Sequence, residues 1–89
     1  MCMGTVESNI LAYIKRRLEA GALSVSETEI MDAVVPPDNP ELRLRPAYRY
    51  GLDRLRRRHV INTVDDRAGM THYFIGNYPS AALRESLGI

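Results

Sequence analysis

The hydrophobic periodicity of this chain changes at Val60. Before that residue, apolar side chains recur every three or four positions, which is the spacing of one face of a helix. From Val60 to Ile75 the chain is rich in β-branched and aromatic residues, interrupted by the polar turn 65–69. Two such runs around a turn predict a β-hairpin. We therefore expect an α+β fold whose helices come first and whose hairpin comes near the end.

Residues 5–20 are predicted to form the first helix. Its buried face would carry apolar side chains at a four-residue repeat: Val6, Ile10, Ile14 and Leu18, joined by Leu11. Gly21 is placed to end this helix, because glycine tolerates the left-handed conformation that commonly follows a helix. Residues 22–25 are short and apolar, and we expect a brief strand there.

The second helix has the clearest start. Ser26 and Glu29 form a capping box, in which the Ser26 hydroxyl accepts from the Glu29 amide and the Glu29 carboxylate reaches back to Ser26. Ile30 is expected to face inward. The helix should run to about Val34, because the two prolines at 36–37 cannot continue its hydrogen bonds.

A proline-rich turn region, 36–45, leads to the third helix, which we expect to begin at Pro46 and to run to about Arg58. Pro40 is expected to begin a short helical turn within the turn region. The buried face of the third helix would be formed by four residues spaced four, three and four apart: Tyr48, Leu52, Leu55 and His59. Gly51 lies beside that face, where it would allow a close helix crossing.

The hairpin strands are predicted at 60–64 and 70–75, with Gly69 at positive φ in the turn and Tyr73-Phe74-Ile75 in the core. Ser80 can cap a last helix over 81–87, whose apolar edge is Leu83 and Leu87. We expect this helix to pack on the first helix or to make a homodimer, with the dimer favoured. The whole chain, 1–89, would be one domain with its core in 5–75 and its C-terminal helix in 80–87.

Composition excludes several classes of protein. No apolar run approaches the roughly 18 residues of a membrane span, and no signal-peptide pattern is present, so we expect a cytoplasmic protein. Cys2 is the only cysteine, and the two histidines, His59 and His72, lack metal-ligand spacing. No nucleophile or paired carboxylate accompanies either histidine. We therefore expect no metal, no cofactor and no enzymatic activity.

Charge is distributed unevenly along a chain whose net charge is only +1. Residues 40–60 contain seven arginines against Glu41 and Asp53, whereas residues 1–39 carry three basic and six acidic side chains. Such a local basic segment is typical of a surface that contacts nucleic acid. The alternative to nucleic-acid contact is an ordinary solvent-exposed helix on which Asp53 pairs with Arg49, Arg56 and Arg57.

The order of elements, the helix over 46–58 and the hairpin ending in Tyr73-Phe74-Ile75 resemble a winged helix-turn-helix domain. The resemblance covers residues 5–75 and implies a three-helix core with a short strand and a hairpin wing. It also implies that the third helix is a recognition helix for the major groove of duplex DNA. The turn region 36–45 is longer than a usual helix-turn-helix turn, so the start of the recognition helix stays open within 40–46.

Recognition helices read bases mostly with their N-terminal half, so Arg49 and Tyr50 are the leading base contacts, with Arg45 next. The remaining candidate DNA-binding residues lie later in the helix, in the turn region and at the wing tip, where they suit phosphates or structural pairing: Arg54, Arg56, Arg57, Arg43 and Arg67.

The function that we expect is DNA binding, as a small transcriptional regulator or as an excision or replication accessory factor. The alternative is a winged-helix module or inhibitor that binds a protein partner, which the acidic first 39 residues favour.

Overall fold

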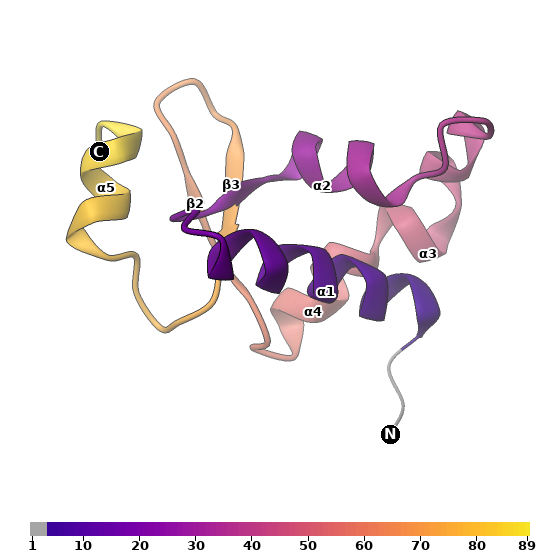
Figure 1. Cartoon of the computed structure of the whole chain (residues 1–89), viewed down its shortest axis with the longest axis horizontal. Coiled ribbons are helices and arrows are strands. Elements are labelled where there is room, and N and C mark those ends of the chain that lie inside the picture. The colour runs from indigo at the N-terminus through magenta and orange to yellow at the C-terminus, as the bar shows by residue number, and fades with distance from the viewer. Residues whose placement is uncertain (1–3) are drawn as a thin grey trace.

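The computed structural model describes residues 4–89, so Cys2 lies outside the described residues. The elements follow in the order α1 (Thr5–Glu19), β1 (Val25–Ser26), α2 (Glu27–Val34), the 3₁₀ helix η1 (Pro40–Leu44), α3 (Pro46–Arg49), α4 (Gly51–Arg57), β2 (Asn62–Asp65), β3 (Thr71–Phe74) and α5 (Ala81–Leu87). Figure 1 shows α1, α2 and α4 gathered on one side of the hairpin and α5 on its other side. The α+β class expected from the sequence is confirmed.

The three strands form one antiparallel sheet in the order β1-β3-β2. Tyr73 is in the middle strand, opposite Val25 on one side and Thr63 on the other. The short strand β1 therefore ties the start of α2 to the hairpin. The brief strand expected at 22–25 is instead Val25–Ser26, so only Val25 of the predicted strand belongs to it, and Ser26 both pairs with His72 and caps α2.

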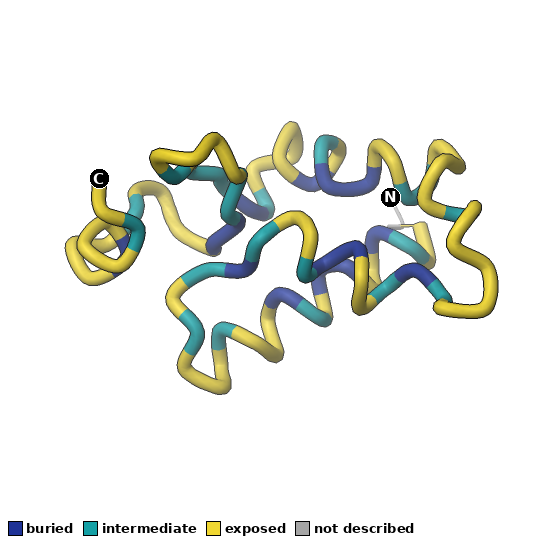
Figure 2. The backbone as a smooth tube through the Cα atoms, turned by 90° about the horizontal axis from the view of Figure 1, so that it is seen from above, coloured by how far each residue is buried: buried dark blue, intermediate teal, exposed yellow. Residues whose placement is uncertain are grey.

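The core lies where α1, α2 and α4 meet the sheet. Its fully buried side chains come from each of these elements and from the step into the hairpin: Ile10, Ile14, Val25, Ile30, Leu55 and Ile61. Figure 2 shows the buried stretches in the middle of the molecule and a mostly exposed segment at the C-terminus. The helical repeats of α1 and α4 thus face the core as the sequence predicts, with Val6 and Leu18 only half-buried.

Half of the expected capping box is present. The Ser26 hydroxyl accepts from the Glu29 amide at 3.2 Å, which confirms the start of α2. The Glu29 carboxylate does not return to Ser26, and this part of the prediction is wrong. It accepts instead from the Tyr13 hydroxyl at 2.7 Å and from Nε of Arg17 at 2.9 Å, so it links α2 to α1.

Three helix ends use a left-handed residue, one of which is Gly88 after α5, at φ 71°. Gly21, at φ 108°, follows α1 as predicted. After α4 the left-handed residue is His59, at φ 58°, and the amides of His59 and Val60 bond to the carbonyls of Arg56 and Leu55. This is the Schellman arrangement, which turns the chain out of the helix. His59 is consequently exposed, and the prediction that it belongs to the buried face is wrong.

The predicted third helix is divided. It begins at Pro46 as expected, but Tyr50, at φ −111° and ψ 1°, separates α3 from α4. The expected close crossing at Gly51 is confirmed, since a Cβ there would lie 2.9 Å from Cδ1 of Ile10. The break lets the Gly51 backbone approach α1 closely.

Both hairpin strands are shorter than predicted at the end away from the turn. β2 begins at Asn62 instead of at 60, and β3 ends at Phe74 instead of at Ile75. Ile75 follows β3 and is 46% exposed, so its expected place in the core is wrong, whereas Tyr73 and Phe74 are buried. Gly69 takes the predicted positive φ, at 87°. Asp66 holds the turn by accepting from the amides of Ala68 and Met70.

The last helix, α5, has the predicted bounds, and the Ser80 hydroxyl accepts from the Leu83 amide at 3.1 Å. Leu83 is 2% exposed within the single chain. In Figure 1, α5 lies beside the hairpin, away from α1, so packing on the first helix is not observed. The homodimer stays a prediction.

Candidate nucleic-acid interface

The candidate interface is built on α3 and α4. Pro46 at the first position of α3 suits a helix start, because its missing N–H would have no partner there. Leu52 and Leu55 are buried against the core and fix which side of α4 faces outward. The exposed sides of both helices carry the arginines, and the chain's own carboxylates divide these arginines into two groups.

The buried carboxylate of Glu7, on α1, pairs with two of these arginines, Arg54 and Arg58. Oε1 of Glu7 lies 3.3 Å from Nη1 of Arg54, and Oε2 lies 3.2 Å from Nη1 of Arg58. The Glu7 side chain is 6% exposed, while both arginines keep more than two fifths of their side chains in solvent. A carboxylate can be buried at tolerable cost only when it is paired. Arg54, expected to be a DNA contact, is therefore first a structural residue.

Asp53 pairs with two more arginines, Arg56 and Arg57. Its Oδ1 lies 2.7 Å from Nη2 of Arg56, and its Oδ2 lies 2.9 Å from Nε of Arg57. The hydrogen bond from Arg56 is the main reason that the pKa of Asp53 is lowered from its ordinary value. These two pairs confirm the pairing expected for Asp53, but the third expected pair, with Arg49, is absent from the ion pairs of residues 4–89.

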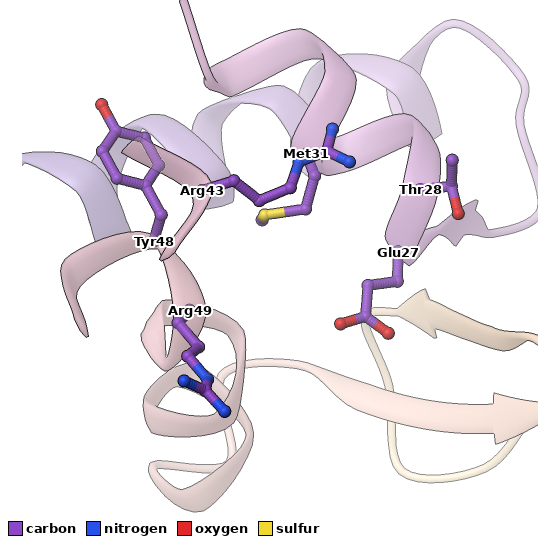
Figure 3. Close-up of a pocket in the computed structure, with 6 residues that line it drawn as sticks. All are labelled: Glu27, Thr28, Met31, Arg43, Tyr48 and Arg49. Atoms are coloured by element: carbon purple, nitrogen blue, oxygen red, sulfur yellow. The ribbon is translucent and has the colours of Figure 1, made fainter. Parts of the chain in front are cut away.

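Arg43 leaves the turn region toward α2. Its Nη2 lies 2.7 Å from Oδ1 of Asp32, and this exposed pair links η1 to α2. Arg43, Tyr48 and Arg49 line a surface cavity of about 270 Å³ together with Met31 and Glu27 of α2, and Figure 3 shows Arg43 extending across it. The turn region thus places Arg43 on the same cavity as Arg49, although the Arg43 guanidinium is already paired with Asp32.

Arg45, Arg49 and Tyr50 remain. Among residues 4–89, neither arginine is in an ion pair, and both are exposed. The Arg49 guanidinium lies over the Tyr50 ring, 5.4 Å from its centroid, and Tyr50 is 46% exposed. Arg45 directly precedes α3. We call these three residues the basic tip; they are also the three residues that the sequence analysis predicts as the leading base contacts.

Arg67 is exposed in the hairpin turn, and Figure 1 shows that turn far from α3. A Cβ at Gly88 would lie 4.0 Å from its Nε, so the end of α5 is close to it. The acidic residues beside it are occupied locally: Asp66 lies 2.9 Å from Nε2 of His72, and Asp65 accepts from Thr71. The fold does not bring Arg67 together with the basic tip.

Comparison of the chain with protein-family models, with curated protein sequences and with solved structures finds no match. No helix within residues 4–89 is long and apolar enough to cross a membrane. In the same part of the chain, no three His, Cys, Asp or Glu side chains group closely enough to hold a metal ion.

Sequence reasoning missed Glu7. It lies three residues before Ile10 and four before Leu11, within the apolar stripe of α1, and a carboxylate in such a stripe is a signal of a buried ion pair. A second residue missed is Tyr73, which lines a cavity between α4 and the hairpin. Composition alone assigned that tyrosine to the core and said nothing of the cavity that it lines.

Proposed function

We propose that the chain is a winged-helix domain that binds duplex DNA through its basic tip, Arg45, Arg49 and Tyr50. The order of helices and strands and the sheet order β1-β3-β2 support the winged-helix assignment. In that assignment α3 and α4 together are the recognition helix and the turn between β2 and β3 is the wing. The resemblance of pattern described above supplies the expectation that this helix enters the major groove.

The observation that carries the proposal is the difference in pairing among the arginines. Five of the seven in residues 40–60 are held by carboxylates of the chain, whereas Arg45 and Arg49 are in no ion pair within residues 4–89. An unpaired, exposed guanidinium can donate to phosphates or to a guanine edge without first giving up a partner. The two unpaired arginines lie at the N-terminal half of the recognition helix, which is the part that reads bases in this family.

Tyr50 adds a second means of contact. Its ring is exposed beside the Arg49 guanidinium, so a sugar or base could pack against it while Arg49 donates hydrogen bonds. Stacking on Tyr50 also restricts the guanidinium before DNA arrives, which lowers the entropy lost on binding.

The testing experiment is a fluorescence anisotropy titration of the full chain with a random-sequence duplex at low and at moderate salt. DNA binding predicts measurable affinity at low salt, where phosphate attraction is strongest, and a loss of affinity as salt rises. The Arg45→Ala/Arg49→Ala variant should lose binding. The Arg84→Ala variant, which removes an exposed arginine of α5, should keep it.

A second candidate function is binding of a protein partner. It is favoured by exposed apolar side chains away from the basic tip, Tyr78 at 86% and Ile75 at 46% exposure. Failure of the parent chain to bind any duplex at low salt would put this function first.

A further inference from the structure

An exposed apolar surface lies where the end of α1 meets the segment that follows β3. Two surface hollows, of about 460 and about 410 Å³, adjoin there, because Ile75 lines both. Leu18 of α1 lines the first hollow and Tyr78 lines the second. Ile75 is 46% exposed and Tyr78 is 86% exposed. We call Leu18, Ile75 and Tyr78 the Ile75 surface; adjoining exposed apolar side chains, unlike single ones, mark an interaction site.

The last helix, α5, does not offer an equivalent surface. Its apolar edge was expected to consist of Leu83 and Leu87, but Leu83 is 2% exposed within the single chain and Leu87 is half-buried. This edge is therefore already covered by the chain's own residues and has little apolar area to bury against a second copy. If the chain forms a homodimer, the Ile75 surface is better suited to it.

Two opposite charges border the Ile75 surface. Lys15 and Glu19 line the first hollow, about one helical turn apart, and both are exposed. Neither is in an ion pair within the part of the chain that the structure describes. The two arginines between them are turned elsewhere, because Arg17 pairs with Glu29 of α2 at 2.9 Å and Arg16 lies over an aromatic ring of its own helix. The surface thus has one unpaired charge of each sign beside its apolar residues.

Such a surface is complementary to itself. In a two-fold dimer, any contact of one residue with another is repeated with the two copies exchanged. Positions 15 and 19 are equally far from position 17, so two antiparallel α1 helices related by an axis at that level place each Lys15 opposite Glu19 of the other copy. Leu18 then lies about 1.5 Å along the helix from the axis, the rise of one residue, so the two leucines meet between the charge pairs.

We propose that the Ile75 surface is the interface of a two-fold homodimer, in which Leu18 and Ile75 of the two copies pack together and Lys15 of each pairs with Glu19 of the other. The matching of the surface to itself is what selects a second copy over an unrelated protein. Figure 1 shows α3 at the N-terminal end of α1 and the hairpin at its C-terminal end, so this interface leaves the basic tip uncovered. The dimer does not depend on DNA binding.

The test is sedimentation equilibrium of the full chain without DNA, at low salt and at protein concentrations up to about 1 mM, which would populate even a weak dimer. The parent should show an equilibrium between monomer and dimer. Lys15→Glu and Glu19→Lys each place like charges opposite one another at two symmetric contacts, so each should weaken the dimer about tenfold. An equimolar mixture of these two variants should recover the parent's affinity, because opposite charges then meet at both contacts.

Three further variants separate this pairing from an effect of net charge. Lys15→Glu/Glu19→Lys in one chain keeps the net charge and restores both pairs, so it should dimerise like the parent. Arg84→Glu and Glu85→Lys make the same changes of net charge at exposed positions of α5. These two should dimerise like the parent, and mixing them should add nothing.

The apolar part of the interface is tested separately. Ile75→Ser should abolish the dimer, whereas Leu44→Ser, which removes a 74% exposed leucine of η1, should keep it. Circular dichroism checks that each variant is folded. A parent that stays monomeric at about 1 mM, a dimer that survives Ile75→Ser, or a mixture of the two reversed variants that is no tighter than either alone would overturn the proposal. A monomeric parent would leave DNA binding by a single domain unaffected.

Discussion

Glu7 and Arg54, forty-seven residues apart in sequence, meet with Oε1 of the carboxylate 3.3 Å from Nη1 of the guanidinium. The contact joins the start of α1 to the middle of α4, and Arg58 completes it on the other carboxylate oxygen. Part of the basic segment therefore stabilises the fold, and the number of arginines alone overstates the charge available to a ligand.

Removing the two arginines and removing the Glu7 carboxylate should lower the free energy of unfolding by different amounts. The Arg54→Ala/Arg58→Ala variant leaves a buried carboxylate unpaired and should lower the free energy of unfolding by about 3 kcal/mol, the low end for a broken buried pair, because the arginines are half-exposed. Glu7→Gln should cost less, because both guanidinium groups are half-exposed and can return to water. Urea unfolding measures both, with Arg84→Ala as the control. A larger loss for Glu7→Gln would contradict this account of the buried charge.

Ser26→Ala should remove the hydrogen bond to the Glu29 amide and lower the free energy of unfolding by about 1 kcal/mol. Ser8→Ala is the matched control, because Ser8 is exposed inside α1 and caps nothing. Thermal unfolding of the two variants should separate them. Equal melting temperatures would mean that the Ser26 hydroxyl does not stabilise the start of α2.

Tyr73 should titrate about two pH units above an ordinary tyrosine. Burial is the main cause that raises its pKa from 10.0 to about 12 in the folded chain. A pKa raised in the folded state contributes stability below pH 10, and that contribution is lost as pH rises from 10 toward 12. Ultraviolet titration of the parent minus that of Tyr73→Phe isolates this residue among the five tyrosines. A difference titration centred near pH 10 would contradict the burial of its hydroxyl.

Asp53→Asn should strengthen DNA binding, because it releases Arg56 and Arg57 from the carboxylate that holds them at 2.7 and 2.9 Å. Two more free guanidinium groups should make the logarithmic dependence of affinity on salt steeper by about two. Glu85→Gln makes the same change of net charge on α5, far from α4, and should change the slope little. If both variants strengthen binding equally, net charge and not the release of these arginines is responsible.

Local signals predicted most of the fold. The Ser26 cap, the Gly21 helix end and the bounds of α5 each depend on residues within a few positions of one another, so the sequence determines them directly. The carboxylate of Glu29 illustrates what sequence cannot supply: its preference for Tyr13 and Arg17 over its own helix start depends on how α1 and α2 pack.

The sequence analysis named the arginines of the candidate site, but it did not predict which of them are paired within the fold. The sequence places seven arginines in one segment, but which are paired depends on carboxylates as distant as Glu7 and Asp32. The break at Tyr50 was also not predicted, since the apolar repeat continues through it and the close contact of Gly51 with Ile10 is tertiary.

The most direct test of the proposed function is the salt dependence of duplex binding by the parent chain and by Arg45→Ala/Arg49→Ala. If only the two unpaired arginines of the basic tip meet DNA, the logarithm of affinity should fall against the logarithm of salt with a slope of about −2, and the variant should lose the binding. No binding by the parent at low salt, or equal binding by parent and variant, would contradict DNA recognition through the basic tip.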